Sequence, residues 1–393
     1  MLRYPDYRNS ILNLINSVEK EFGVTNDHPT LAVADAILAK QYRNVVIMVF
    51  DAMGSRNLEL LLPQDSFLRS HMVQEITSVF PPTTTAATTT LESGLAPCEH
   101  AWIGWSLYFP EIADNVNIFP NTNYDEESIA DYHVVSRYLP YKSVVEKINA
   151  LSQARAESIS YFGSYHTESY EEILEAVETL CKEEGRHYLY TYWNEPDTSM
   201  HNMGITSESA AAWVQRINKD LEELSNRLQD TVLFVIADHG HINSTNKYIG
   251  DYPDIMDTLK WLPSIEPRAL AFYVKEGRET EFETAFLRHF GGDYILLPKQ
   301  EVINQRLFGR GNVHPRFEEF LGDYLAIAIG DLSIFYSRKD AEHCIGVHAG
   351  LTDREMMVPL IVIECEEKTD LQPDIDANGK DALEVSLNLN KDK

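Results

Sequence analysis

Short apolar segments alternate with helical patterns along most of this chain, and this alternation limits its fold more than any other feature. Five segments rich in β-branched or aromatic residues predict buried strands: residues 45–50 (VVIMVF), 75–80 (EITSVF), 188–193 (YLYTYW), 232–237 (VLFVIA) and 358–364 (VPLIVIE). Residues 170–184 and 208–228 have helical patterns. Strands that alternate with helices form a mostly parallel sheet with helices on both faces. We therefore expect a doubly wound α/β fold, with ligands bound beyond the carboxyl ends of the strands.

The 393 residues exceed what one compact core usually holds, so we expect several parts. An apolar stripe predicts an N-terminal helix within residues 1–30, and Gly23 is a plausible end for it. Residues 31–249 and 346–365 would form the catalytic core, interrupted at 105–141 by a segment of hairpins or an excursion over the sheet edge. Residues 250–345 predict a small α+β insert that caps a site. The polar tail at 366–393 is expected to be partly disordered.

Charge and cysteine usage narrow the range of partners. A formal net charge of −28 argues against wrapping nucleic acid or docking on an anionic membrane, since both need a basic face. A small anionic substrate stays possible, because a metal ion can reverse the local field. The four cysteines are scattered without a C-x-x-C pair, and no signal-peptide pattern or bilayer-length apolar run is present. We therefore expect a cytoplasmic protein.

Aspartates and histidines gather at the ends of the predicted strands: Asp51 after 45–50, Asp197 and His201 after 188–193, Asp238 and His239 after 232–237, and His348 before 358–364. Each alone has an ordinary explanation, such as a helix N-cap, a turn or a packed histidine. Together they would converge on one edge of the sheet. Mixed carboxylate and imidazole ligands suit Zn²⁺, with Mn²⁺ also possible. Two such ions a few ångströms apart suit phosphoryl transfer.

A run of threonines follows the strand at 75–80, in the stretch VFPPTTTAATTTLESG (79–94). Threonine is a mediocre helix former, so a threonine-rich loop or edge strand is one interpretation. The other is a reactive hydroxyl in the first turn of a helix, at the positive end of its dipole and among unpaired amides. Such a helix N-terminus is a phosphate site. Because no histidine lies beside the threonines to act as base, metal coordination would have to lower the pKa of the hydroxyl.

Five motifs, in order, resemble those of the alkaline phosphatase superfamily, and within it the nucleotide pyrophosphatase/phosphodiesterase branch. They are Asp51 after its strand, FPPTTTAATTTLESGLAPCEH, PDTSMH, ADHGH and GVHAGLTDREMMVP, and they span residues 45–363. The resemblance implies a fold of alkaline phosphatase type and two divalent metal ions. Asp51, Thr84, Asp238 and His239 would hold one ion, and Asp197, His201 and His348 the other. His241 is expected beside these ligands and not among them.

The resemblance also implies a nucleophile. In this branch it lies nine residues before the small hydroxyl residue of the xGLxP segment, here Ser93, and counting back reaches Thr84. A slip of one position would exchange it for Thr83 or Thr85, which stay open as alternatives.

Two departures from the family pattern and the absence of a sulfatase motif bear on the substrate. Trp105 occupies the position where phosphodiesterase members usually carry an asparagine that contacts a phosphoryl oxygen, so we expect Trp105 to border the substrate. His100-Ala101 replaces a common His-Gly pair. The C-x-P-S-R motif of sulfatases is absent, which counts against sulfate esters.

The sequence therefore predicts a two-metal hydrolase that forms a phosphothreonine intermediate, acting first of all on a phosphodiester or nucleotide pyrophosphate. A phosphomonoesterase, a phosphonate hydrolase or a phosphomutase-like enzyme is the alternative. A metal-stabilised scaffold without activity is the hypothesis of another class, although the full set of ligands and the hydroxyl are present. The oligomeric state is not predicted.

Overall fold

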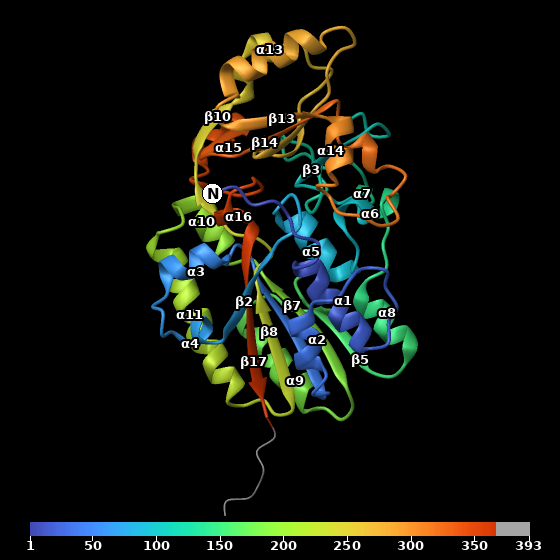
Figure 1. Ribbon diagram of the computed structural model, residues 1–393, viewed down its shortest axis with the longest axis vertical. Helices are drawn as coiled ribbons and strands as arrows, with labels where there is room; N and C mark the ends of the chain where they lie inside the picture. Colours follow the sequence, from blue (N-terminus) through green and yellow to red (C-terminus); the bar gives the residue numbers. More distant parts are fainter. Residues whose placement is uncertain (367–393) are drawn as a thin grey trace, which may run out of the picture.

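The computed structural model describes residues 1–366 and contains two large sheets, one in the lower half of Figure 1 and one above it. The tail predicted at 366–393 therefore lies almost wholly outside the described residues. The larger sheet has seven strands in the order β2 (Met72–Thr77), β17 (Met357–Cys365), β8 (Thr231–Ile236), β1 (Asn44–Phe50), β7 (His187–Trp193), β5 (Arg155–Ser160) and β6 (Tyr165–His166). Strand β17 pairs antiparallel with β2 and β8, whereas β8, β1, β7, β5 and β6 pair in parallel. The predicted mostly parallel α/β sheet is confirmed.

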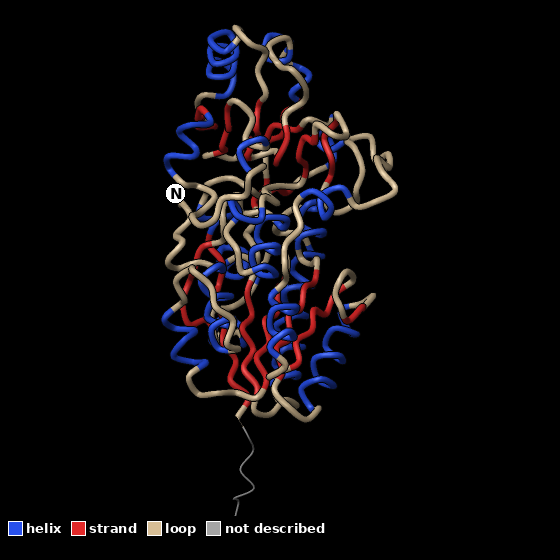
Figure 2. The backbone as a smooth tube through the Cα atoms, turned by 90° about the vertical axis from the view of Figure 1, so that its right-hand side faces the viewer, coloured by secondary structure: helices blue, strands red, loops and turns tan. Residues whose placement is uncertain are grey.

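Helices cover both faces of this sheet, as Figure 2 shows. Every residue of β1 is buried, which is expected only for a strand covered on both sides. Helix α1 (Ile11–Glu21) contacts both α2 (Ala32–Leu38) and α5 (Thr84–Ser93), and α5 contacts α8 (Val144–Leu151). Helix α11 (Glu208–Ser225) contacts α3 (Ser55–Leu61) and α4 (Phe67–Ser70), and lies beside α9 (Tyr170–Lys182) through the Tyr170 and Trp213 rings.

The second sheet is antiparallel and joins two distant parts of the chain. Its order is β13 (Tyr294–Pro298), β14 (Tyr324–Ala328), β12 (Ala269–Phe272), β11 (Ser264–Glu266), β3 (Ser106–Phe109) and β4 (Asp114–Asn117). The hairpin β3–β4, from the segment expected to leave the core, thus completes the sheet of the predicted insert. The domain boundaries themselves stay a prediction.

Alternation along β12 explains how this second sheet is packed. Ala269 and Ala271 face the main hydrophobic core, whereas Leu270 and Phe272 face a separate cluster beneath helix α13 (Glu279–Phe290). The second sheet is therefore covered by α13 on one side and shares the core of the large sheet on the other.

Short elements complete the described chain. The short helices are α6 (Pro97–His100), α7 (Val134–Tyr138), α10 (Asp197–Met203), α12 (Pro253–Met256), α14 (Lys299–Gln305), α15 (Arg338–His343) and α16 (Asp353–Met356). Two small sheets pair β10 (Thr245–Tyr248) with β15 (Leu332–Phe335) and β9 (Ile242–Asn243) with β16 (Gly346–Val347). In residues 1–366, no helix combines the length and apolar character needed to cross a bilayer.

Strand β2 ends at Thr77, three residues before the predicted end at Phe80. The chain leaves the sheet there because Ser78 bonds elsewhere: its N–H donates to Met356 O at 2.8 Å and its hydroxyl donates to Asp238 O at 2.5 Å. This departure carries the threonine run toward the ends of the other strands.

A buried ion pair joins the two sheets. Arg268, between β11 and β12, donates to both carboxylate oxygens of Glu355 in α16, at 2.6 and 2.9 Å, and both side chains are fully buried. The guanidinium also donates to the carbonyls of Gly330 and Leu332. The remaining donors are thus satisfied, as a buried charge requires.

Replacing Glu355 with alanine should lower the free energy of unfolding by about 3–5 kcal/mol, because Arg268 would stay buried without its anion. Urea unfolding followed by circular dichroism measures this. Asp251→Ala is the control, since its pair with Arg338 is more than half exposed and should contribute almost nothing. A Glu355→Ala protein as stable as Asp251→Ala would contradict this account of the contact between the sheets.

Candidate active site

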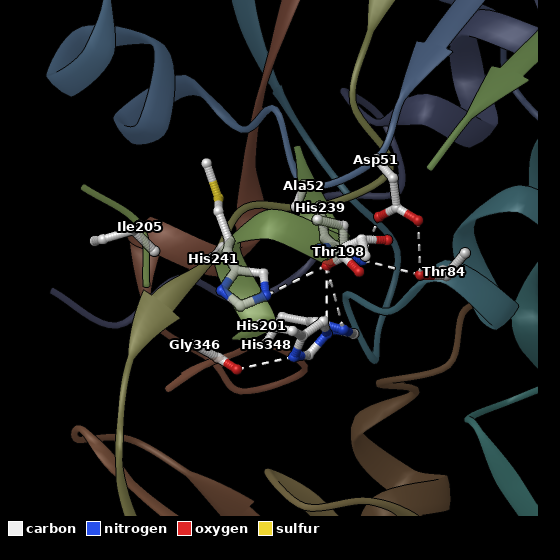
Figure 3. A network of polar contacts seen from close by, with 12 residues as sticks. Asp51, Ala52, Thr84, Thr198, His201, Ile205, His239, His241, Gly346 and His348 are labelled. Carbon is white, nitrogen blue, oxygen red and sulfur yellow. Dashed lines mark hydrogen bonds and ion pairs between the residues drawn. The ribbon is translucent and has the colours of Figure 1, made fainter. Parts of the chain in front are cut away.

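The directions of the strands bring the predicted site residues to one edge of the large sheet. Strands β1, β7 and β8 are parallel, so Asp51 after β1, Asp197 after β7 and Asp238 after β8 follow the same ends of their strands. Strand β17 runs the opposite way and therefore begins at this edge, which places the preceding residue His348 there. Figure 3 shows the side chains converging from these separate elements.

One group of side chains surrounds Asp51. Its Oδ2 accepts hydrogen bonds from the hydroxyl of Thr84 at 3.3 Å and from the hydroxyl of Tyr192. The Nε2 atom of His239 lies 3.2 Å from Asp51 Oδ1, 3.5 Å from Asp238 Oδ2 and 3.2 Å from Thr84 Oγ1. Asp238 is held by its other oxygen, which accepts from the N–H groups of Ala52 and His239 at 3.1 and 2.9 Å.

A second group surrounds Asp197, which begins helix α10. Its Oδ1 lies 3.3 Å from His241 Nε2, 3.4 Å from His201 Nε2 and 4.0 Å from His348 Nε2. His201 reaches it from one helical turn further along α10. His241, expected only beside the ligands, is thus as close to Asp197 as His201 is, and the ligand atoms of all four residues lie within 4.8 Å of one another.

The chemistry of these donors fits a metal centre. The Nδ1 atoms of His201, His239 and His348 contact the backbone carbonyls of Gly346, Gly240 and Pro82 at 2.8, 3.1 and 3.2 Å. With the proton on Nδ1, each Nε2 offers a lone pair toward carboxylate oxygens that can themselves only accept. Within residues 1–366 the buried oxygens Asp51 Oδ1, Asp197 Oδ1 and Asp238 Oδ2 also lack a hydrogen-bond donor. Acceptors that face acceptors need either a proton or a metal cation between them.

The crowding of carboxylates also shifts the pKa values of the histidines and aspartates in the site. Burial lowers the pKa of His239, but the carboxylates of Asp238 and Asp51 outweigh it and raise that pKa to about 10. Burial lowers the pKa of His201 too, yet Asp197 raises it to about 9. Burial and the nearby Asp51 raise the pKa of Asp238 well above its ordinary value. Protons therefore neutralise the crowded carboxylates when no metal is bound, and metal binding has to displace them.

The hydroxyl of Thr84 lies at the start of helix α5, beside Asp51 and His239. Thr83 is the N-cap residue, and the first helical N–H with a backbone acceptor belongs to Ala87. The amides of the first turn thus point outward without intrahelical partners, as they do at any helix N-terminus. Asp238 and His239 are fully buried, whereas Thr84 is half-buried. Asp197 and His201 are also partly exposed, whereas His241 and His348 are buried.

Two residues near the site were not predicted. Tyr192 lies on β7 and its hydroxyl donates to Asp51, but in the sequence it is one aromatic residue within an apolar strand. Glu266, on β11 of the second sheet, accepts from the hydroxyl of Thr83 and from the N–H of Trp105. A carboxylate inside the buried segment SIEPRALAF was the only signal for it. The side chain of Trp105 is 41% exposed and its ring packs on Phe119.

Comparison with known proteins places these features in context. Residues 45–351 match the family model described as type I phosphodiesterase / nucleotide pyrophosphatase. Curated protein sequences offer no match.

Several solved structures share the fold. Murine ectonucleotide pyrophosphatase/phosphodiesterase 5 has a TM-score of 0.63 and 16% identity, over 80% of this chain and 87% of its own. An inactive threonine-to-alanine variant of that murine protein, in complex with AMP, has a TM-score of 0.62 with the same identity and coverage. Phosphonoacetate hydrolase from Sinorhizobium meliloti, in complex with phosphonoformate, has a TM-score of 0.60 and 16% identity, over 84% of this chain and 92% of its own.

Replacing Asp197 with alanine should remove most of the bound metal, because Asp197 supplies a ligand atom to both candidate ligand groups. Metal content after dialysis against Zn²⁺ measures this, and so does the thermal shift that Zn²⁺ produces. At a hundredfold excess over the dissociation constant, Zn²⁺ should stabilise the unaltered chain by about 2.7 kcal/mol. Asp220→Ala, at an exposed helical pair with Arg216, is the control. An Asp197→Ala protein with the metal content of Asp220→Ala would show that the site is not a metal centre.

Proposed function

Since the chain belongs to the type I phosphodiesterase / nucleotide pyrophosphatase family, and is thus a hydrolase acting on phosphate esters, we propose that it cleaves phosphodiester or nucleotide-pyrophosphate bonds with Thr84 as nucleophile. Two divalent ions would assist the reaction. The family match supports the class of reaction, and the geometry of the site supports the assignment of residues.

One observation carries this proposal. The Thr84 hydroxyl lies 3.3 Å from Asp51 and 3.2 Å from His239, at the N-terminus of a helix of ten residues. The hydroxyl therefore lies both beside residues that would hold a metal ion and beside the free amides at the start of α5. Neither Thr83 nor Thr85 does so: the hydroxyl of Thr83 is bonded to Glu266, and that of Thr85 is buried without a partner within residues 1–366.

The residues of the chain would divide the work as follows. Asp51, Thr84, Asp238 and His239 would hold one ion, and Asp197, His201 and His348 the other, with His241 as a further ligand of the second. When bound, the ions would lower the pKa of the Thr84 hydroxyl and stabilise negative charge on the attacking and leaving oxygens.

Thr84 Oγ1 would attack phosphorus opposite the leaving oxygen, and the phosphorus–oxygen bond to the leaving group would break. The amides in the first turn of α5 would donate to the phosphoryl oxygens throughout. The Thr84 proton would pass to solvent, and the leaving oxygen would take up a proton. The product of this step is a phosphothreonine, which keeps the second ester group of a diester. Attack of water on phosphorus would then break the bond to Oγ1 and return the hydroxyl.

The family match favours a diester or nucleotide pyrophosphate as the substrate, since the matching family model is described as type I phosphodiesterase / nucleotide pyrophosphatase. The AMP complex of the murine protein supports a substrate that contains a nucleotide. A monoester or a phosphonate, the substrate class of the Sinorhizobium enzyme, is the second candidate.

Metal identity and location belong to the same proposal. The mixture of imidazole and carboxylate ligands suits Zn²⁺ best, with Mn²⁺ as the alternative. All four cysteines are free, which supports a reducing compartment such as the cytoplasm.

Thr84→Ala should lower kcat by about three orders of magnitude or more, whereas Thr84→Ser, which keeps a hydroxyl, should retain measurable turnover. Assays with bis-(p-nitrophenyl) phosphate measure both. Thr90→Ala is the control, because its hydroxyl lies on the same helix but bonds to His100. Full activity of Thr84→Ala would exclude this nucleophile.

The preference for a diester is tested separately. We expect a higher kcat/KM for bis-(p-nitrophenyl) phosphate than for p-nitrophenyl phosphate, because the chain matches a family model of phosphodiesterases. A strong preference for the monoester would contradict the proposed substrate class and leave the nucleophile unaffected.

A further inference from the structure

The second sheet places a buried carboxyl group against the turn that carries the proposed nucleophile. Glu266 is 5% exposed, and its Oε1 accepts from the Thr83 hydroxyl at 2.5 Å and from the Trp105 N–H at 2.7 Å. Within residues 1–366, no lysine, arginine or histidine pairs with it at salt-bridge distance. A buried carboxyl held only by two uncharged donors is costly, so its position calls for an explanation.

The backbone around this contact is shaped to permit it. Ile265, next to Glu266, has a φ of 80°, a conformation that a β-branched residue adopts only under strain. A Cβ added to Gly104 would lie 2.5 Å from Ile265 Cγ2 and 2.8 Å from its Cα. Gly104 therefore lets β11 approach the chain beside Trp105. Both features lie next to the two residues, Glu266 and Trp105, that make this contact.

The contact changes what Thr83 does at the start of α5. Thr83 has the extended backbone of an N-cap residue, with φ −142° and ψ 149°. A threonine in that place usually accepts a hydrogen bond from the amide of the second or third helical residue. Here its side chain makes no such bond, because the hydroxyl is turned toward Glu266. The first amides of α5 are left free.

We propose that Glu266 is a positioning residue that holds the Thr83 hydroxyl away from the first amides of α5 and so keeps them open for the phosphoryl oxygens of the substrate. This inference rests on the proposed function, because it assigns those amides to the substrate of Thr84. The second sheet is then a necessary part of the active site. The same carboxyl oxygen also accepts from the backbone N–H of Trp105, whose ring is exposed and packs on Phe119.

The role needs a hydrogen-bond acceptor and not a charge. Burial raises the pKa of Glu266 to about 7, although the bonds from Thr83 and Trp105 oppose the shift. Oε1 accepts from both donors in either protonation state. Glutamine has a carbonyl oxygen at the end of a side chain of the same length, so Glu266→Gln should preserve this role. Glu266→Ala should abolish it.

Binding of inorganic phosphate to the Zn²⁺-loaded protein, measured by calorimetry, tests the proposal without requiring turnover. Glu266→Ala frees Thr83 to cap the helix and should weaken phosphate binding about 10- to 100-fold, the effect of losing one charge-assisted hydrogen bond. Glu266→Gln should bind within about threefold of the unaltered protein. Adding Thr83→Val to Glu266→Ala removes the competing hydroxyl and should restore most of the lost affinity.

Glu92→Ala is the matched control. Glu92 also accepts a hydroxyl, that of Tyr141 at 2.8 Å, but it lies at the opposite end of α5. Its loss should lower thermal stability without changing phosphate affinity. Where the protein hydrolyses bis-(p-nitrophenyl) phosphate, kcat/KM should follow the same order across the variants.

Recovery of affinity in the double variant is the result that a merely structural role cannot produce. Unchanged phosphate binding in Glu266→Ala, failure of Thr83→Val to restore it, or no phosphate binding by the unaltered protein would each overturn the inference. Phosphate binding with this pattern but no hydrolysis of any ester would instead overturn the proposed function and leave the role of Glu266 intact.

Discussion

The central constraint on this structure is that three aspartates are held close together at one edge of a sheet, although their negative charges repel one another. Asp51 and Asp238 are almost fully buried, and Asp197 is within reach of both groups of histidines. Oxygens that can only accept a hydrogen bond face imidazole nitrogens whose other nitrogen already contacts a carbonyl. Such an arrangement is unfavourable without positive charge between the ligands, supplied by protons or by metal ions. The fold supplies the rigidity that keeps these groups together despite their repulsion.

Two features of the topology make this possible. Parallel strands place the residues that follow them on one edge, and the single antiparallel strand β17 brings the residues that precede it to the same edge. The second sheet then approaches from the opposite side through β11 and carries Glu266 to the start of α5. The site is thus formed between two layers that are also joined by the buried pair of Arg268 and Glu355.

Local pattern was enough to predict five of the seven strands of the large sheet, the helices α1, α9 and α11, and the gathering of aspartates and histidines, because each of these follows from residues that are neighbours in the chain. Long-range pairing was not predictable in this way. Strand β3 of the hairpin β3–β4 pairs with β11, which is more than a hundred residues away in the chain. The sequence of the hairpin does not indicate which strand it pairs with. Tyr192 and Glu266 were missed for the same reason, since their contacts with Asp51 and Thr83 arise only in the folded chain. The closeness of His241 to Asp197 depends likewise on the path of the chain after β8.

The central claim is that Thr84, at the start of α5, attacks phosphorus. Its most direct test is to quench the protein with acid during turnover of a phosphodiester and to locate any phosphorylated residue by tandem mass spectrometry. The account predicts a phosphorylated peptide with the phosphoryl group on Thr84. Phosphorylation of Thr83 or Thr85 instead of Thr84 would contradict it. So would turnover in which residues 79–94 stay unphosphorylated under conditions that trap the intermediate.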